Sequence, residues 1–286
     1  MEPSLKTDTT KILKKLIKFY KESNISEEEE YEFTEGFVDK YLSENNKASL
    51  LRTLGLTANA EAFAQHYLLK GEASKGVNKL VQGLYWMYKC IQLQNFYNRT
   101  TPFLVYKFGY AMGISWLLGK DEILETIMAK FEEFLRYEKT TMVTHSFHTS
   151  FLYLLYKKDF TSLENYFDNE DSIYVRLLVN IEKSNQELMP LLIEACDNHL
   201  IRSSAMSNKV IDTEFCCLDL YPYEIFCYLL VRKKMGFDTP IIPHKLMETL
   251  VATADLSLAT YHPEDDVLLM KILSLLEKGR ELGFRG

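Results

Sequence analysis

The histidines are the most versatile catalytic side chains in this chain, and they are scattered along it. They are His66, His145, His148, His199, His244 and His262. His145 and His148 are three residues apart, so a helix would place them on one face. A zinc site needs further ligands, and the sequence indicates none for this pair. We therefore favour a structural role for them at the start of a helix.

The cysteines show neither a disulfide pattern nor a catalytic one. They are Cys90, Cys196, Cys216, Cys217 and Cys227. Their number is odd, no CxxC occurs, and most lie in apolar helical patterns, so we expect buried free thiols in a reducing compartment. Cys216 and Cys217 stand near Glu214 and Asp219, and such acids disfavour the reactive thiolate. We predict no catalytic thiol.

Carboxylates are abundant, but their spacing is typical of helix starts. Ser26 followed by Glu29 forms a capping-box pattern, and the acids at 27–30 suit the positive end of a helix dipole. The run His-Pro-Glu-Asp-Asp at 262–266 has the same character. GxxxxGK[ST], GxSxG, HExxH and a GxGxxG after a strand are absent. We predict no catalytic, cofactor-binding or metal-binding residue, no cofactor and no enzymatic activity.

The segment 212–237 combines acids and tyrosines inside an apolar helical pattern. Tyrosine brings a large contact area with a polar tip, which is typical of recognition surfaces. The predicted partner-binding residues are Asp212, Glu214, Asp219, Tyr221, Tyr223 and Glu224. The alternative is structural: Asp219 or Tyr221 caps a helix whose first residue is Pro222.

The elements that must position these residues are predicted to be helices. Apolar residues recur with helical spacing, and glycine and proline are scarce, at 12 and 7 of 286 residues. We expect helices through 12–20, from Ser26, and at about 47–69, 74–97, 102–118, 121–137, 144–157, 160–167, 171–183, 187–203, 213–235, 244–254 and 264–282. The predicted fold class is all-α: an irregular array of antiparallel helical hairpins, solenoid-like or a bundle, in a single domain over 1–286.

The charge and the apolar runs bear on partners and location. The 33 basic and 40 acidic residues give a net charge of −7, which argues against nucleic-acid binding and favours basic partners. The most apolar run, 103–119, is short for a bilayer span, so we expect a buried helix whose Gly109 and Gly113 permit close packing. The N-terminus lacks a secretory pattern. We predict a cytoplasmic protein that binds no membrane.

The lysines of the first helix admit two interpretations. Lys11, Lys14, Lys15, Lys18 and Lys21 surround its apolar face. A basic amphipathic helix can lie on a membrane. We favour a terminal helix with a solvated lysine face, because the chain is acidic overall.

The acidic and aromatic start of 212–237, its apolar helix and its Met-Gly-Phe end resemble the C-terminal part of the Imm49 family of bacterial immunity proteins. The Ala-rich helix at 48–69 and the amphipathic helix at 74–97 are similar to that family's N-terminal half. The resemblance spans about 45–255, between N-terminal helices at about 1–45 and a C-terminal helix at 256–286. It implies an all-helical protein, encoded beside a polymorphic toxin, that binds and neutralises this toxin by occlusion.

The predicted partner is therefore a cognate toxin protein, for example a basic nuclease domain, which an acidic inhibitor would meet quickly. Two alternatives remain open. A helical-repeat adaptor would bind a peptide or protein in a groove. An all-α enzyme acting on prenyl or nucleotide substrates would need Asp-rich pairs for Mg²⁺ on facing helices, which the apolar helices lack.

Overall fold

The computed structural model describes residues 8–23, 26–43, 58–93, 107–137, 145–158, 172–203 and 218–281. Within these ranges the regular structure is helical and contains no strand, so the predicted all-α class is confirmed. The α-helices are α1 (Thr9–Glu22), α2 (Glu27–Ser43), α4 (Ala58–Leu69), α5 (Ala73–Leu93), α6 (Lys107–Leu117), α7 (Asp121–Tyr137), α8 (His145–Lys157), α9 (Ile173–Val179), α10 (Asn185–Ile201), α11 (Tyr223–Lys234) and α12 (Val267–Glu281). The 3-10 helices are η4 (Lys245–Glu248), η5 (Leu256–Leu258) and η6 (Pro263–Asp265).

Local sequence signals set several helix ends. Ser184 forms a capping box with Glu187 at the start of α10. Before α2, the Ser26 hydroxyl accepts a hydrogen bond from a backbone N–H in the first turn. Gly71 and Gly236 follow α4 and α11 with φ of +83° and +88°, a left-handed conformation that glycine adopts without a Cβ clash. These are the stops that the sequence predicts.

Helix α6 lies inside the core. Its side chains from Phe108 to Trp116 are buried, and it packs against α5, α7, α8 and α11. Gly113 lets α11 approach closely, since a Cβ there would meet the Tyr223 ring at 2.5 Å. The predicted buried helix is confirmed, as is close packing at Gly113. In the described ranges, no helix combines the length and the apolar character that a membrane span requires.

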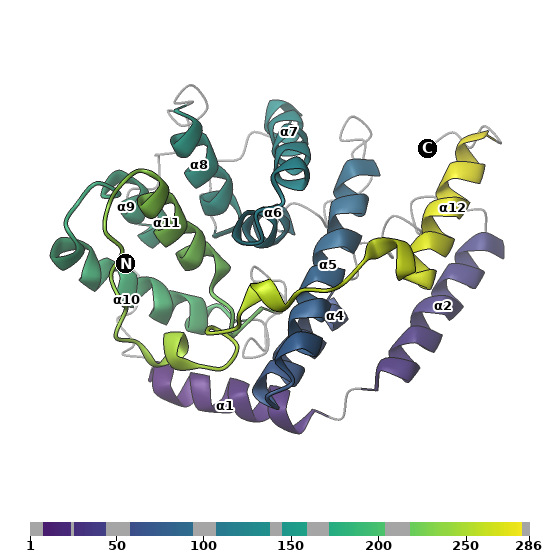
Figure 1. Ribbon diagram of the computed structural model, residues 1–286, viewed down its shortest axis with the longest axis horizontal. Coiled ribbons are helices and arrows are strands. Elements are labelled where there is room, and N and C mark those ends of the chain that lie inside the picture. Colours follow the sequence, from purple (N-terminus) through teal and green to yellow (C-terminus); the bar gives the residue numbers. More distant parts are fainter. Residues whose placement is uncertain are drawn as a thin grey trace.

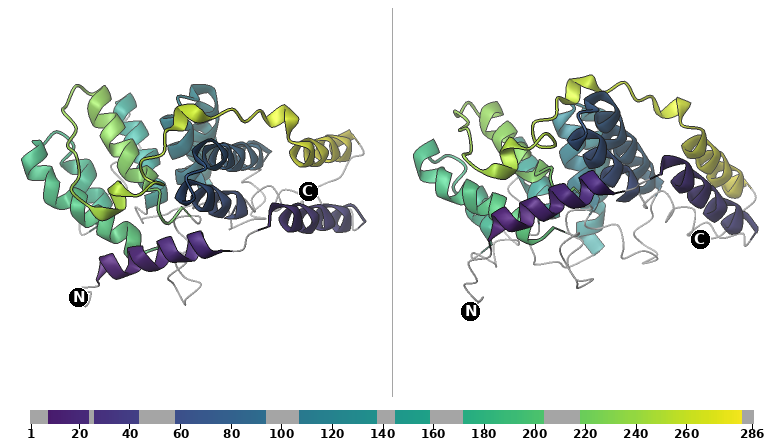
Figure 2. Two further views of the ribbon diagram at one scale, coloured as in Figure 1. Left: turned by 60° about the horizontal axis from the view of Figure 1, so that its bottom comes forward. Right: turned by 90° about the horizontal axis from the view of Figure 1, so that it is seen from below.

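Helices adjacent in sequence pack as pairs, with α4 against α5 and α6 against α7. Helices from opposite ends of the chain also meet: α2 and α12 lie side by side (Figures 1 and 2), and Lys271 of α12 donates to Glu35 and Asp39 of α2 at 2.9 and 3.2 Å. The segment from Phe237 to α12 crosses α5 in Figure 1. The finer choice between a solenoid and a bundle stays a prediction.

Two predicted helices differ from the structure. Residues 218–222 form a turn, and α11 begins only at Tyr223. Pro222 explains this boundary, because a proline disfavours the helical conformation of the residue before it, here Tyr221. The predicted helix at 244–254 is the short η4 followed by turns. There the Thr249 hydroxyl bonds to the backbone of Leu246 and Ala252 and competes with helical bonding. The predicted helix at 160–167 lies outside the described residues, as do parts of those at 47–69, 74–97, 102–118 and 213–235.

Candidate functional site

The predicted partner-binding residues lie in the core instead of on the surface. The four that the structure describes are buried: Asp219, Tyr221, Tyr223 and Glu224. Asp212 and Glu214 lie outside the described residues. A buried side chain offers no contact area to a partner, so the predicted recognition surface is wrong for the four described residues.

Helix capping, the alternative role, is wrong as well. The N-cap position of α11 is Pro222, which makes no side-chain cap bond. Asp219 lies in the turn before the helix, where its carboxylate accepts a hydrogen bond from the Tyr20 hydroxyl at 2.7 Å. The acid therefore connects the entry of α11 to α1, 199 residues earlier in the chain.

Helix α4 completes this junction with two adjacent side chains. His66 Nδ1 donates to the backbone carbonyl of Tyr20 at 2.7 Å. Gln65 Oε1 accepts from the backbone N–H of Leu220 at 2.7 Å. Both α4 side chains are buried, where unpaired backbone groups are costly. The last turns of α1 are thus hydrogen-bonded to α4 and to the 218–222 turn.

His199 of α10 and Glu224 of α11 form a second buried pair, in which Nδ1 and Oε1 lie 2.7 Å apart. Burial alone lowers the pKa of an imidazole. The Glu224 charge, its hydrogen bond and the nearby Asp219 more than offset this, so the pKa of His199 lies above 6.5. Both side chains are almost fully withdrawn from solvent, so the pair holds α10 against α11 and is closed to a dissolved substrate.

The described thiols are equally inaccessible to a dissolved substrate. Cys90, Cys196 and Cys227 are buried, as predicted, and Cys216 and Cys217 lie outside the described residues. Burial, with the Glu224 charge nearby, raises the pKa of Cys196 and Cys227 well above its ordinary value. Neither thiol is a nucleophile at neutral pH.

The other end of α1 is held by α10 and η4. Thr9 Oγ1 donates to Asp197 Oδ1 at 2.6 Å, and His244 Nε2 lies 3.2 Å from the same oxygen. His244 Nδ1 accepts from the backbone N–H of Leu246. This leaves Nε2 as the protonated nitrogen that donates to Asp197. Both ends of α1 are therefore joined to the body through side chains.

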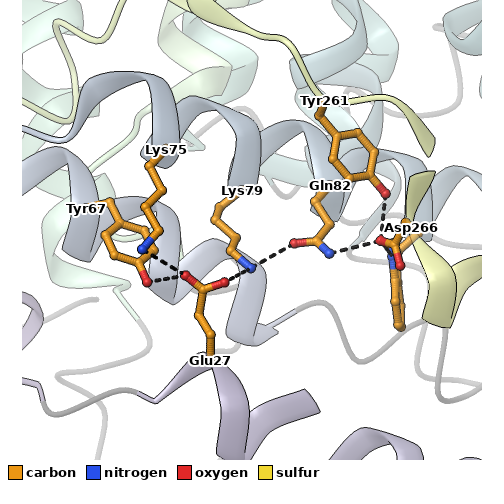
Figure 3. Close-up of polar contacts among 8 residues, drawn as sticks. Glu27, Tyr67, Lys75, Lys79, Gln82, Tyr261 and Asp266 are labelled. Atoms are coloured by element: carbon orange, nitrogen blue, oxygen red, sulfur yellow. Dashed lines mark hydrogen bonds and ion pairs between the residues drawn. The ribbon is translucent and has the colours of Figure 1, made fainter. Parts of the chain in front are cut away.

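Helix α2 is attached through Glu27 (Figure 3). Its carboxylate pairs with Lys75 and Lys79 of α5, at 3.3 and 2.7 Å, and accepts a hydrogen bond from Tyr67 of α4. Burial alone would raise the pKa of Glu27, but the Lys79 and Tyr67 hydrogen bonds and the Lys79 charge lower it to about 2. The residue that we predicted as a helix-dipole acid is also the link between α2 and the α4–α5 pair.

The same face of α5 holds the C-terminal segment (Figure 3). Asp266 Oδ2 accepts from Gln82 Nε2, Trp86 Nε1 and the Tyr261 hydroxyl at 2.9, 2.8 and 2.7 Å. Asp266 Oδ1 accepts from the backbone N–H of Leu269 in the first turn of α12. The acidic turn at 262–266 is a helix start, as predicted, and its last acid also fixes α12 to α5.

The outward face of α1 is basic. Leu13, Leu16 and Tyr20 face the core. The exposed residues include Lys11, Lys14, Lys15, Lys18 and Lys21. Among them lies Phe19, whose surface is 55 % exposed. The interpretation that we favoured for this helix, a terminal helix with solvated lysines, agrees with these positions.

Sequence reasoning missed Tyr20, His199 and Arg232 as polar links. Tyr20 and His199 fall on apolar helical faces. The signal that could have identified them is that a buried tyrosine hydroxyl or imidazole needs a hydrogen-bond partner. Arg232 is buried and donates to the carbonyls of Ile181, Lys183 and Asp238 and to Asn185. The sequence does not show this link, because its acceptors are mostly backbone groups.

Within the described ranges, no group of three or more His, Cys, Asp or Glu side chains is placed to hold a metal ion. Comparisons with models of protein families, with curated proteins and with solved structures found no match.

Proposed function

We propose that this chain is an immunity protein, which binds the toxin protein encoded beside it and neutralises that toxin by covering a surface it needs. The proposal joins the resemblance of segments 48–69, 74–97 and 212–237 to the Imm49 family with the all-α fold of the described residues. α4, α5 and α11 are the helices within those segments.

The main support for the proposal is that the potentially reactive acids and histidines form hydrogen bonds between elements of the fold. Asp219 bonds to Tyr20, Glu224 to His199, and Asp197 to both Thr9 and His244. Each contact joins two different elements, and the first two are buried. Side chains used in this way stabilise a scaffold, and a scaffold acts through its exposed helix faces.

Co-expression tests this proposal. The gene beside that of this chain is expressed in a host lacking both genes, with and without the chain. We expect the neighbour alone to arrest growth, the chain to restore it, and the two proteins to purify together. A toxin from an unrelated system is the control and stays lethal. A harmless neighbour, or a lethal one that the chain fails to neutralise, would contradict the proposal.

A helical adaptor that binds a peptide is the second candidate, and the paired packing of α4 with α5 and of α6 with α7 favours it. The two functions differ in what the partner must be. An adaptor retains its affinity for a short unfolded segment of its partner, whereas an occluding inhibitor needs the folded domain. Titration with the intact partner and with its overlapping peptides separates them.

A further inference from the structure

Helices α2 and α12 are attached to the same row of side chains on α5. The residues of this row are spaced four, three and four apart, which places them on one face of the helix. The α5 row consists of Lys75, Lys79, Gln82 and Trp86. Glu27, the first residue of α2, pairs with the two lysines. Asp266, the residue before α12, accepts hydrogen bonds from the other two members. The two attachments are therefore neighbours on α5.

Lys79 and Gln82 connect the two attachments (Figure 3). The Lys79 ammonium pairs with Glu27 at 2.7 Å and donates to Gln82 Oε1 at 3.1 Å. Gln82 Nε2 in turn donates to Asp266 Oδ2 at 2.9 Å. A continuous chain of polar contacts therefore runs from the first residue of α2 to the residue before α12.

The Gln82 amide makes this chain cooperative. An amide oxygen accepts and an amide nitrogen donates, and here the oxygen faces an ammonium while the nitrogen faces a carboxylate. The reversed amide would place nitrogen against the ammonium and oxygen against the carboxylate, and both contacts would repel. Lys79 and Asp266 thus select the same orientation, and each strengthens the bond that the other makes. Loss of the Glu27 charge leaves Lys79 less firmly placed, so it also weakens the bond between Gln82 and Asp266.

Helices α2 and α12 also contact each other away from α5. Lys271 of α12 donates to Glu35 and Asp39 of α2, and these residues lie beyond the first turn of their helices. The two helices lie side by side at the edge of the molecule (Figures 1 and 2). They are thus joined at α5 and again farther along, which favours movement as one body.

The contacts that hold α2 to α5 are partly exposed to solvent. The side chains of Glu27 and Lys79 are 36 % and 18 % exposed, whereas α6 is buried among α5, α7, α8 and α11. Ion pairs that water reaches contribute little to stability, and elements held in this way open more readily than the core. Val38 of α2 and Leu269 of α12 are buried, so the closed state is the major one and the open state a minor population.

We propose that α2 and α12 form a single arm, which Glu27 and Asp266 latch to α5 through Lys79 and Gln82, and which opens as a unit while the other helices stay folded. Opening releases the Tyr67 hydroxyl and the Trp86 indole N–H from their carboxylate acceptors. The latch is a conformational device of the fold and stands independently of the proposed function.

The alternative is that each acid fixes its own helix separately. Glu27 would then hold α2, and Asp266 would hold α12, with no effect of one attachment on the other. The two cases differ in a measurable way, because only a shared latch transmits the loss of one acid to the helix that carries the other.

The test is amide hydrogen exchange of the full-length chain, followed by mass spectrometry. The variants are Glu27→Gln and Asp266→Asn, which keep the shape of each side chain, and asparagine still caps α12. The matched controls are Glu29→Gln and Asp265→Asn, which remove the same charge from exposed neighbours of the two acids.

We expect either variant to raise exchange rates about tenfold in both α2 and α12, since each removes charge-assisted hydrogen bonds from the shared latch. Amides of α6 and α10 should keep their rates. The controls should exchange like the unmodified chain.

Gln82→Met tests the connection itself, because methionine has a similar length and helix propensity but neither donates to Asp266 nor accepts well from Lys79. In this background the effect of Glu27→Gln should be confined largely to α2. An effect on α12 of undiminished size would overturn the connection through Gln82.

Three results in the chain with Gln82 would overturn the latch. Faster exchange only in the helix whose acid is changed would mean separate attachments. Faster exchange in α6 and α10 to the same degree would mean that the acids stabilise the whole fold and that no separate arm opens. Unchanged exchange in both helices would mean that neither acid holds them.

Discussion

The buried pair of His199 and Glu224 makes the stability of this protein depend on pH. The pKa of His199 is raised in the folded state, so the pairing stabilises the fold fully below about pH 6.5, the unfolded value. This contribution is lost as pH rises through the folded pKa. We expect the free energy of unfolding, measured with urea, to fall as pH rises from about 6.5 through the folded pKa of His199.

Glu224→Gln should abolish this component of the pH dependence and destabilise the protein by about 3 kcal/mol, since it removes one partner of a buried pair. Urea unfolding of both proteins at pH 6 and at pH 8.5 checks it. An equal pH dependence in the variant would show that another group titrates.

Gly113 is expected to tolerate no side chain. In Gly113→Ala the new Cβ would meet the Tyr223 ring at 2.5 Å, and overpacking of this kind costs about 1–3 kcal/mol. Gly36→Ala in α2 is the control, because nothing lies within 4 Å of its Cβ position. There the helix propensity of alanine should raise stability by up to about 1 kcal/mol. Equal effects at both sites, measured by urea unfolding, would contradict the packing of α6 on α11.

The C-terminal end of α1 is expected to be held in part by the Tyr20 hydroxyl. Tyr20→Phe leaves Asp219 without this hydrogen bond in a buried site, at a cost of about 1–3 kcal/mol. Amide hydrogen exchange in α1 should become faster, because the helix loses a link to the 218–222 turn. Tyr31→Phe on an exposed position of α2 is the control. Unchanged exchange in α1 would mean that its apolar face alone fixes it.

The attachment of α2 is expected to survive mild acid. The pKa of Glu27 is about 2, so its contribution to stability is complete above the unfolded value of 4.5 and is lost only as pH falls through about 2. A carboxyl-carbon NMR titration should give Glu27 a midpoint near pH 2. A midpoint near 4.5 would show that Lys75 and Lys79 do not hold it.

The sequence predicts elements well where the signal is local. Ser184 with Glu187, Gly71 and Gly236 mark helix ends correctly because caps and left-handed turns involve neighbouring residues. The turn at 218–222 was missed because the apolar pattern of 213–235 continues through it, although Pro222 is a local sign of a helix start there. The hydrogen bond from the Leu220 N–H to Gln65, which holds the turn, joins residues 155 positions apart and has no signal within the segment.

The candidate site was misplaced for the same reason. Asp219, Tyr221, Tyr223 and Glu224 interrupt an apolar pattern, and an interruption predicts exposure unless a buried partner exists. Two of those partners, Tyr20 and His199, lie on other helices. Polar side chains inside an apolar pattern are therefore ambiguous between surface recognition and buried pairing.

For the whole molecule, polar side-chain contacts that are buried or partly buried connect the ends of the chain to its middle. Asp219 and Asp197 hold α1, Glu27 holds α2, and Asp266 holds α12. Such a scaffold presents exposed helix faces in fixed positions. This is what an occluding inhibitor requires, because a preformed surface binds with little loss of entropy.

Direct titration of the protein encoded beside this chain, the toxin of our proposal, while its activity is followed, tests the proposed function. We expect saturable binding, with toxin activity falling in parallel with the bound fraction until it is lost at saturation. Toxin activity that persists when the toxin is saturated with the chain, or the absence of binding, would contradict it.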